Sequence, residues 1–170
     1  AGSMEGLLDF PAASPRGIAL VAHPHPLYGG AMDNKVAQTL ARTFVDLGYE
    51  AWRPNFRGVG QSEGKHDEGR GEVDDLEVVY QELKSQSVVL AGFSFGAAMQ
   101  ARLAQRVSSE RIVLVGVAVA VEVGVAVAVG RGPDLPIDLV PRHRQLLITP
   151  QVPVDATGAQ VGAAEPVLLG

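Results

Sequence analysis

The chain has 170 residues, of which 14 are basic and 19 acidic, and it contains no cysteine. This length favours one domain, and 46% hydrophobic residues are enough to build its core. A net charge of -5 gives no cationic field for a phosphate backbone, so nucleic acid is not an expected partner. The lack of cysteine excludes disulfides, thiolate metal sites and a cysteine nucleophile.

Residues 1–4 resemble an expression scar, that is, a short remnant encoded by an expression vector. The expected fold is a single domain over residues 5–170. No signal peptide is recognisable at the start, so the expected location is the cytoplasm. The apolar run from Ile112 to Val129 is about as long as the shortest membrane-spanning helices, which have roughly 17 residues. Its valines fall at every odd position, which is a strand pattern, so no membrane contact is expected.

Short apolar runs alternate with amphipathic stretches along the first two thirds of the chain. This order predicts an α/β fold with a mostly parallel, doubly wound sheet. The expected strands cover residues 6–9, 17–22, 49–56, 87–91 and 111–121, and the expected helices lie at about 33–47, 72–83 and 95–107. Prolines break up the last fifty residues, where only 145–149 reads as a strand. The Val/Ala stretch could also form two strands that meet near Glu122 and Gly124.

A serine flanked by two glycines stands between an expected strand and an expected helix. Residues 92–96 read G-F-S-F-G and fit G-x-S-x-G, the motif of a nucleophile held on a sharp turn. Larger side chains in place of these glycines would collide with the neighbouring strand and helix. The helix N-terminus would point free N–H groups at the reaction site. We expect Ser94 to be a nucleophile; the alternative is a buried serine bonded to a backbone carbonyl.

A second motif, H-P-H-P-L-Y-G-G at residues 23–30, directly follows an earlier expected strand. In acyl-transfer enzymes of this architecture, the loop after that strand supplies one oxyanion N–H, and the residue after the serine supplies the other. Because proline has no N–H, His25 is the best donor in this loop, ahead of Leu27 and Tyr28. Phe95 is the expected donor at the serine turn.

Four segments carry a resemblance to a known family. They read HPHPLYGGAMDNK at 23–35, NFRGVGQS at 55–62, GRGEVDD at 69–75 and AGFSFGA at 91–97. Together they resemble the α/β-hydrolase superfamily, in particular its short bacterial dienelactone-hydrolase-like members. The resemblance covers roughly residues 5–120. It implies a sheet of α/β-hydrolase type, a nucleophilic Ser94, an oxyanion hole framed by His25 and Phe95, and an ester, thioester or related acyl substrate.

The general base of this superfamily is missing from its usual place. The triad runs in the order Ser, acid, His, yet only His143 follows Ser94, and no histidine follows Asp155, the nearest substitute for the acid. Three explanations stay open. The C-terminal part is truncated or rearranged and has lost the base; a displaced base acts at His143, His23 or His25; or a second copy of the chain, in a homo-oligomer, completes the site.

Two other binding functions have weaker support. His23 and His25 could ligate a metal with His66 and Asp67, but no further spacing supports a bound ion. The glycines of residues 57–64 superficially resemble a dinucleotide motif, but no helix opens after them. We therefore expect neither a metal nor a cofactor.

The remaining histidines are expected to have structural roles. Packing suits His23 better than His25, and His66 and His143 are expected in solvated loops. The alternative to an enzyme is a catalytically degenerate hydrolase fold that serves as a binding or self-association module, because a shortened sheet would expose its last strand.

Overall fold

The computed structural model describes residues 2–84, 86–119, 122–123 and 128–130. The chain divides into two compact units, residues 1–139 and 140–170, and the described residues all belong to the first. His143, Asp155 and the strand expected at 145–149 lie outside the described residues.

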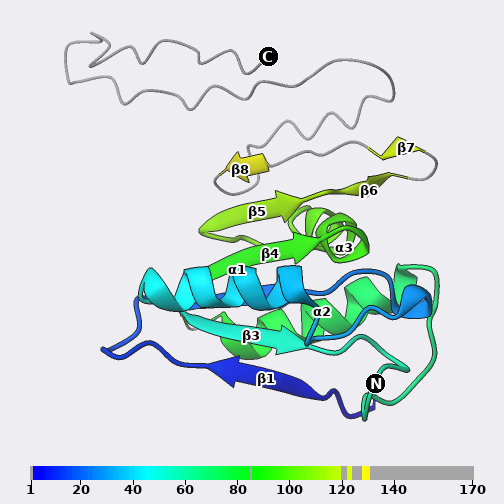
Figure 1. Cartoon of the computed structure of the whole chain (residues 1–170), viewed down its shortest axis with the longest axis horizontal. Coiled ribbons are helices and arrows are strands. Elements are labelled where there is room, and N and C mark those ends of the chain that lie inside the picture. The colour runs from blue at the N-terminus through cyan, green and yellow to red at the C-terminus, as the bar shows by residue number, and fades with distance from the viewer. Residues whose placement is uncertain (1, 85, 120–121, 124–127, 131–170) are drawn as a thin grey trace, which may run out of the picture. The chain divides into compact units, whose positions relative to one another are not determined.

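A six-stranded sheet has the strand order β1-β3-β2-β4-β5-β8 (Figure 1). Its strands are β1 (Gly6–Asp9), β2 (Ile18–Ala22), β3 (Glu50–Pro54), β4 (Val88–Phe93), β5 (Arg111–Val115) and β8 (Ala128–Gly130). The four central strands run parallel, whereas β1 and β8 pair antiparallel to their neighbours. This topology confirms the expected α/β class with a mostly parallel sheet.

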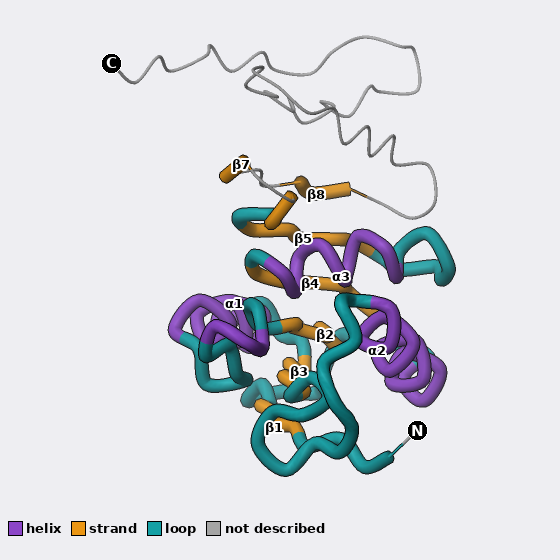
Figure 2. Tube along the Cα trace, turned by 90° about the vertical axis from the view of Figure 1, so that its right-hand side faces the viewer, coloured by secondary structure: helices purple, strands orange, loops and turns teal. Residues whose placement is uncertain are grey.

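Helices cover both faces of the sheet, as Figure 2 shows. They are α1 (Lys35–Asp46), α2 (Arg70–Leu83) and α3 (Phe95–Leu103), and a short 3-10 helix, η1 (Pro26–Tyr28), follows β2. Ala37, Ala41 and Phe44 of α1 pack against one face, together with the odd-numbered residues of β2 and β4. The even-numbered residues of these strands pack with α2 and α3 on the other face. Because both faces are covered, β2 is buried along its whole length.

The helix ends explain where the sequence prediction was right and where it was wrong. Asn34 caps α1, since its Oδ1 accepts from Val36 N at 3.0 Å, and Gly48 follows that helix with φ of 87°. α2 begins at Arg70, two residues before the expected start, because Glu72 reaches back to accept from Gly69 N at 2.8 Å. α3 ends at Leu103, earlier than the expected end near residue 107.

The Val/Ala stretch is not one long strand over residues 111–121. β5 ends at Val115, and Gly116 then takes a φ of 53°, which turns the chain out of the sheet. β6 (Ala118–Val119) and β7 (Glu122–Val123) pair with each other, and β8 returns to pair with β5. β5 is therefore hydrogen-bonded on both sides and is not an exposed edge. Among the described residues, no helix is long and apolar enough to cross a membrane.

Residues 2–4, set aside in the sequence analysis, contact the loop that follows β3. Ser3 N donates to Glu63 Oε2 at 2.9 Å, and Glu63 N donates to Ser3 O at 3.0 Å. Met4 packs against the hydrophobic core on the α2 and α3 face. Residues 2–4 thus make contacts with the folded unit.

Candidate active site

Ser94 stands at the turn between β4 and α3 in a strained backbone conformation. Its φ of 55° and ψ of -116° lie outside the regions that residues with a side chain normally adopt. Two backbone hydrogen bonds hold it there: Ser94 N donates to Val115 O at 2.9 Å, and Ala98 N donates to Ser94 O at 3.1 Å. The residue is half-buried, and its hydroxyl makes no hydrogen bond to any described residue. The alternative of a buried serine bonded to a carbonyl thus finds no such bond among the described residues.

The two glycines around Ser94 are required by close backbone contacts. A Cβ atom on Gly92 would lie 2.6 Å from the carbonyl carbon of Gly96. A Cβ atom on Gly96 would collide with the carbonyl oxygens of Ala22 and His23, at the end of β2. The start of α3 therefore lies directly against the residues that lead into the loop after β2.

Replacing Gly96 by alanine is expected to lower the free energy of unfolding by about 1 to 3 kcal/mol, the usual cost of overpacking a filled site. Urea unfolding would measure the loss. Gly29→Ala measures the backbone cost without a collision: a Cβ atom there has no neighbour within 4 Å, but φ of 76° makes alanine strained by about 1 kcal/mol. A Gly96→Ala variant as stable as the parent would contradict the close packing of α3 on β2.

The loop after β2 leaves one amide without a protein acceptor. Leu27 N donates to His25 Nδ1 at 3.2 Å, and Tyr28 N donates to His25 O at 3.1 Å. Among the described residues, His25 N has no acceptor, and Pro24 and Pro26 carry no N–H. Of the three donors considered from the sequence, only His25 is therefore free to bind a ligand.

The amide of Phe95 is placed close to this loop. As the first residue of α3, Phe95 has no intrahelical acceptor for its N–H. The Phe95 ring lies 4.7 Å from the His25 ring, measured between centroids. In addition, Ala22 pairs with Gly92 in the register of β2 and β4, so the His25 loop and the serine turn leave the sheet side by side. The structure thus brings together Ser94, His25 and Phe95.

His23 is a buried packing residue. Its side chain is inaccessible to solvent, and its Nε2 accepts from Phe56 N at 3.0 Å. Since Nε2 accepts, the proton is on Nδ1, which lies 2.7 Å from Pro24 O. Burial lowers the pKa of His23 to about 4, so the ring is neutral at pH 7. With both nitrogens engaged, His23 can serve neither as a displaced base nor as a metal ligand.

His66 does not lie in a solvated loop, contrary to the sequence-based expectation. Its side chain is only 12% exposed, and its Nδ1 is 2.8 Å from Glu72 Oε1, although the two atoms are not aligned for a full hydrogen bond. The His66 ring lies 4.9 Å from the His25 ring and 5.6 Å from the Phe95 ring, between centroids. His66 therefore belongs to the candidate site.

Glu72 supports His66 from the first turn of α2. Its carboxylate is fully buried and accepts from Asp67 N at 2.9 Å and from Gly69 N at 2.8 Å. Partial burial and the neighbouring His66 lower the pKa of His25 below its ordinary value. Within the described ranges, no group of three or more His, Asp or Glu could hold a metal ion.

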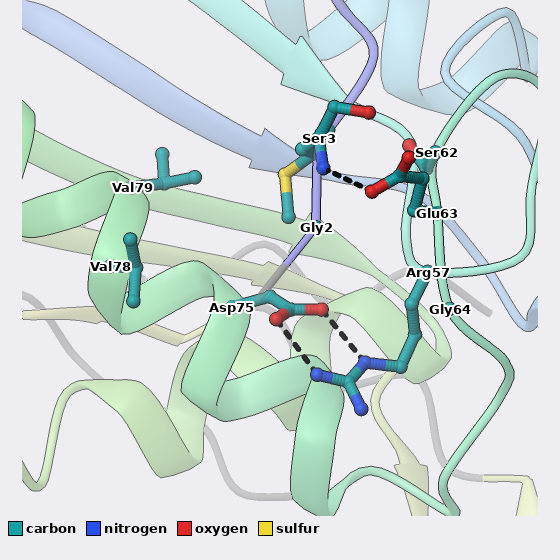
Figure 3. Close-up of a pocket in the computed structure, with 10 residues that line it drawn as sticks. Gly2, Ser3, Arg57, Ser62, Glu63, Gly64, Asp75, Val78 and Val79 are labelled. Atoms are coloured by element: carbon teal, nitrogen blue, oxygen red, sulfur yellow. Dashed lines mark hydrogen bonds and ion pairs between the residues drawn. The ribbon is translucent and has the colours of Figure 1, made fainter.

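A small cavity of about 210 Å³ lies elsewhere, between the N-terminal residues and α2 (Figure 3). Arg57 and Asp75 form an ion pair beside it, with Arg57 Nε 2.7 Å from Asp75 Oδ2. None of the three residues Ser94, His25 and Phe95 lines this cavity. The candidate active site is therefore at the ends of β2 and β4 and not in this hollow.

Comparisons with known proteins give one family model and one similar curated protein. The family model described as serine aminopeptidase, S33 (Hydrolase_4) matches residues 13–148. An uncharacterised protein of Rickettsia prowazekii (strain Madrid E) is 48% identical over 101 residues, which cover 56% of this chain and 42% of that protein.

Two similar solved structures are both α/β serine hydrolases. An α/β serine hydrolase homologue from Coxiella burnetii is 39% identical, with a TM-score of 0.67 over 71% of this chain and 61% of that one. An α/β serine hydrolase without a lid from Xanthomonas campestris is 34% identical, with a TM-score of 0.64 over 74% of this chain and 61% of that one. The chain thus spans about three fifths of the length of these two structures.

Proposed function

We propose that this chain, which belongs to the serine aminopeptidase S33 family of α/β hydrolases, is a serine hydrolase that attacks an ester, thioester or related acyl substrate with Ser94. The observation that carries the proposal is the strained, half-buried Ser94 at the end of β4, next to two amides that have no acceptor within the described part of the chain. Strain of this kind, of order 1 to 3 kcal/mol per residue, persists where function requires it.

The chemistry follows from this placement. Attack of the Ser94 hydroxyl oxygen on an acyl carbon converts the carbonyl oxygen into an oxyanion. The amides of His25 and Phe95 would donate to that oxyanion, and the N-terminus of α3 adds its positive end to the same place. Collapse of the tetrahedral intermediate expels the leaving group, which takes up the proton that the Ser94 hydroxyl lost. Water then hydrolyses the acyl-enzyme to the free acid and returns a proton to the Ser94 oxygen.

The test is covalent labelling by a fluorophosphonate, read by mass spectrometry of the digested protein. We expect one adduct on Ser94 in the folded protein and none in Ser94→Ala. Protein unfolded in urea serves as a control, because the turn and the amides are then lost. Absence of an adduct from the folded parent, or equal labelling of the unfolded chain, would contradict an activated serine.

Side chains beside the site favour an apolar group in the substrate. Leu27 and Tyr28, on η1, are 69% and 87% exposed, and the Tyr28 ring lies 4.8 Å from the His25 ring. We propose that Tyr28 contacts the acyl or leaving group. Tyr28→Ala is expected to raise KM for an apolar ester about fivefold, as the loss of roughly 1 kcal/mol of apolar contact predicts. Steady-state kinetics would measure this change.

Leu47→Ala is the matched control for Tyr28→Ala. Leu47 is also an exposed apolar residue, at 54%, but it caps the C-terminal end of α1. That end leads into the start of β3, away from the end of β4 where Ser94 lies. We expect its KM to equal that of the parent. Equal KM values for both variants and the parent would exclude Tyr28 from the substrate site.

A further inference from the structure

The loop after β2 is fixed to residues 53–56 at both of its ends. At its start, His23 Nε2 accepts from Phe56 N at 3.0 Å. At its far end, the backbone N–H and C=O of Met32 are both bound by side chains from β3 and from the residue that follows this strand. His25, whose amide is the proposed oxyanion donor, lies between these two anchors.

Two buried side chains make the anchor at Met32. Asn55 Oδ1 accepts from Met32 N at 2.8 Å. Arg53 Nη1 donates to Met32 O at 2.9 Å. Removal of either side chain would leave a partly buried polar group of Met32 without its partner, which is unfavourable. The position of Met32 therefore depends on both residues.

Both side chains are themselves held from β1 and the residue before it. Asn55 Nδ2 donates to Glu5 Oε2 at 2.8 Å. Arg53 donates to Asp9 Oδ2 from Nε at 3.1 Å and from Nη2 at 2.8 Å, and these are charge-assisted hydrogen bonds. Because each side chain has partners on two sides, neither can turn away from Met32 without breaking a second interaction.

The chain between His25 and Met32 passes directly against the peptide bond that carries the His25 N–H. Gly30 N donates to His25 O at 3.0 Å. A Cβ atom on Gly30 would collide with the carbonyl oxygen of Pro24, which belongs to the same peptide bond as the His25 N–H. Since Met32 is only two residues after Gly30, a displacement of Met32 would be transmitted to this peptide bond.

We propose that Asn55 and Arg53 are positioning residues that fix the His25 amide through Met32; this inference rests on the proposed serine hydrolase function. They act through the loop and not on the reacting atoms. Their hydrogen bonds hold the His25 N–H in place before the acyl carbon is attacked. A donor that is already in place stabilises the developing oxyanion without any reorganisation during the reaction.

The experiment is a double-mutant cycle on the rate of fluorophosphonate labelling of Ser94. Its proteins are the parent, Asn55→Ala, His25→Pro and the double variant. Proline removes the amide proton whose position Asn55 is proposed to fix. Tyr49→Phe is the matched control: Tyr49 immediately precedes β3, as Asn55 immediately follows it, and its hydroxyl donates to Glu110 Oε1 at 3.1 Å. Thermal unfolding of each variant checks that it is folded.

We expect Asn55→Ala to slow labelling roughly 10- to 100-fold, since a small misplacement of a catalytic group has effects of this size. In the His25→Pro background, the same substitution is expected to change the rate less than about twofold, because the donor that Asn55 positions is already absent. Tyr49→Phe should be labelled at the parental rate. An effect of Asn55→Ala that is equal in both backgrounds, or absent from the parent background, would overturn the proposal.

Arg53→Lys gives a second test, which is decisive if Asn55→Ala does not fold. Lysine keeps the positive charge beside Asp9 but lacks the planar fork of donors that also reaches Met32 O. We expect Arg53→Lys to slow labelling in the parent background and to have little further effect in His25→Pro. Equal effects in the two backgrounds would exclude a role through the His25 amide.

Hydrogen exchange of the folded parent tests the anchor without any substitution. The Met32 amide is expected to exchange more slowly than the His25 amide, which has no acceptor among the described residues. Equal exchange of the two amides would contradict the anchor.

A failure of this inference differs from a failure of the proposed function. If the folded parent is labelled at Ser94 but the effects of Asn55→Ala and His25→Pro multiply, the positioning role is wrong and the serine hydrolase function stands. If the folded parent is not labelled at all, the proposed function fails and this inference fails with it.

Discussion

Replacing His25 by proline is expected to lower kcat/KM for an ester substrate about 100- to 1000-fold below that of His25→Ala, because it deletes one oxyanion donor worth roughly 2.7 to 4 kcal/mol. The backbone at this position accepts proline, since φ of His25 is -58°. The carbonyl oxygen of residue 25 would still accept from Tyr28 N and Gly30 N, so the turn keeps these two hydrogen bonds.

His25→Ala is the necessary control for this prediction. Alanine and proline both remove the imidazole and its hydrogen bond to Leu27 N, but only proline removes the amide proton. The ratio of the two kcat/KM values therefore isolates the backbone donor. Thermal unfolding of both variants would check the fold. Equal kcat/KM values in two folded variants would exclude the His25 amide from the oxyanion hole.

Lowering the pH from 6.5 to 4 is expected to cost about 3 kcal/mol of unfolding free energy through His23 alone. In the folded protein its pKa is about 4, whereas an exposed histidine titrates at 6.5. As the pH falls through this window, the unfolded chain binds a proton that the folded chain does not. Unfolding therefore becomes more favourable by about 1.4 kcal/mol per pH unit, and the stabilisation is fully present only above pH 6.5.

Urea unfolding of the parent and of His23→Gln at several pH values between 7 and 5 would test this dependence. We expect His23→Gln to be less stable at pH 7 but to have a flatter dependence on pH. The pKa of His25 is also lowered, so the same unfolding measurements on His25→Ala would show how much His25 contributes to the pH dependence. Glu5, Asp67 and Glu110 also have lowered pKa values, but their stabilisation is lost only as the pH falls below about 4 to 5. Identical slopes for the parent and His23→Gln would contradict the assignment.

Much of the fold could be predicted because it depends on local patterns. The apolar runs at 17–22 and 87–91 are strands buried on both faces, and such strands lack the alternation of a half-exposed strand. The serine turn could be predicted for a steric reason, since only glycine fits at Gly92 and Gly96. The adjacency of His25 and Phe95 follows from the parallel order of β2 and β4.

Other features depend on contacts that local patterns do not encode. His66 reaches the site because the loop after β3 folds back onto the first turn of α2, where His66 Nδ1 lies 2.8 Å from Glu72 Oε1. Nothing in the sequence near His66 marks this long-range contact, so the polar neighbours favoured a solvated loop. Likewise, alternating valines predict a strand but do not show which strand it pairs with. The left-handed φ of Gly116 ends β5 and so divides the valine-rich stretch.

The register of β2 and β4 has a consequence for substrate choice. Five residue pairs, from Ile18 with Val88 to Ala22 with Gly92, join these strands up to the point where the His25 loop and the serine turn emerge. In the proposed enzyme, this hydrogen-bond ladder would fix the spacing between the Ser94 oxygen and the amide of His25. Such a rigid oxyanion site would accept any acyl group of the right charge distribution. Discrimination among substrates must then come from surfaces outside the ladder, such as η1.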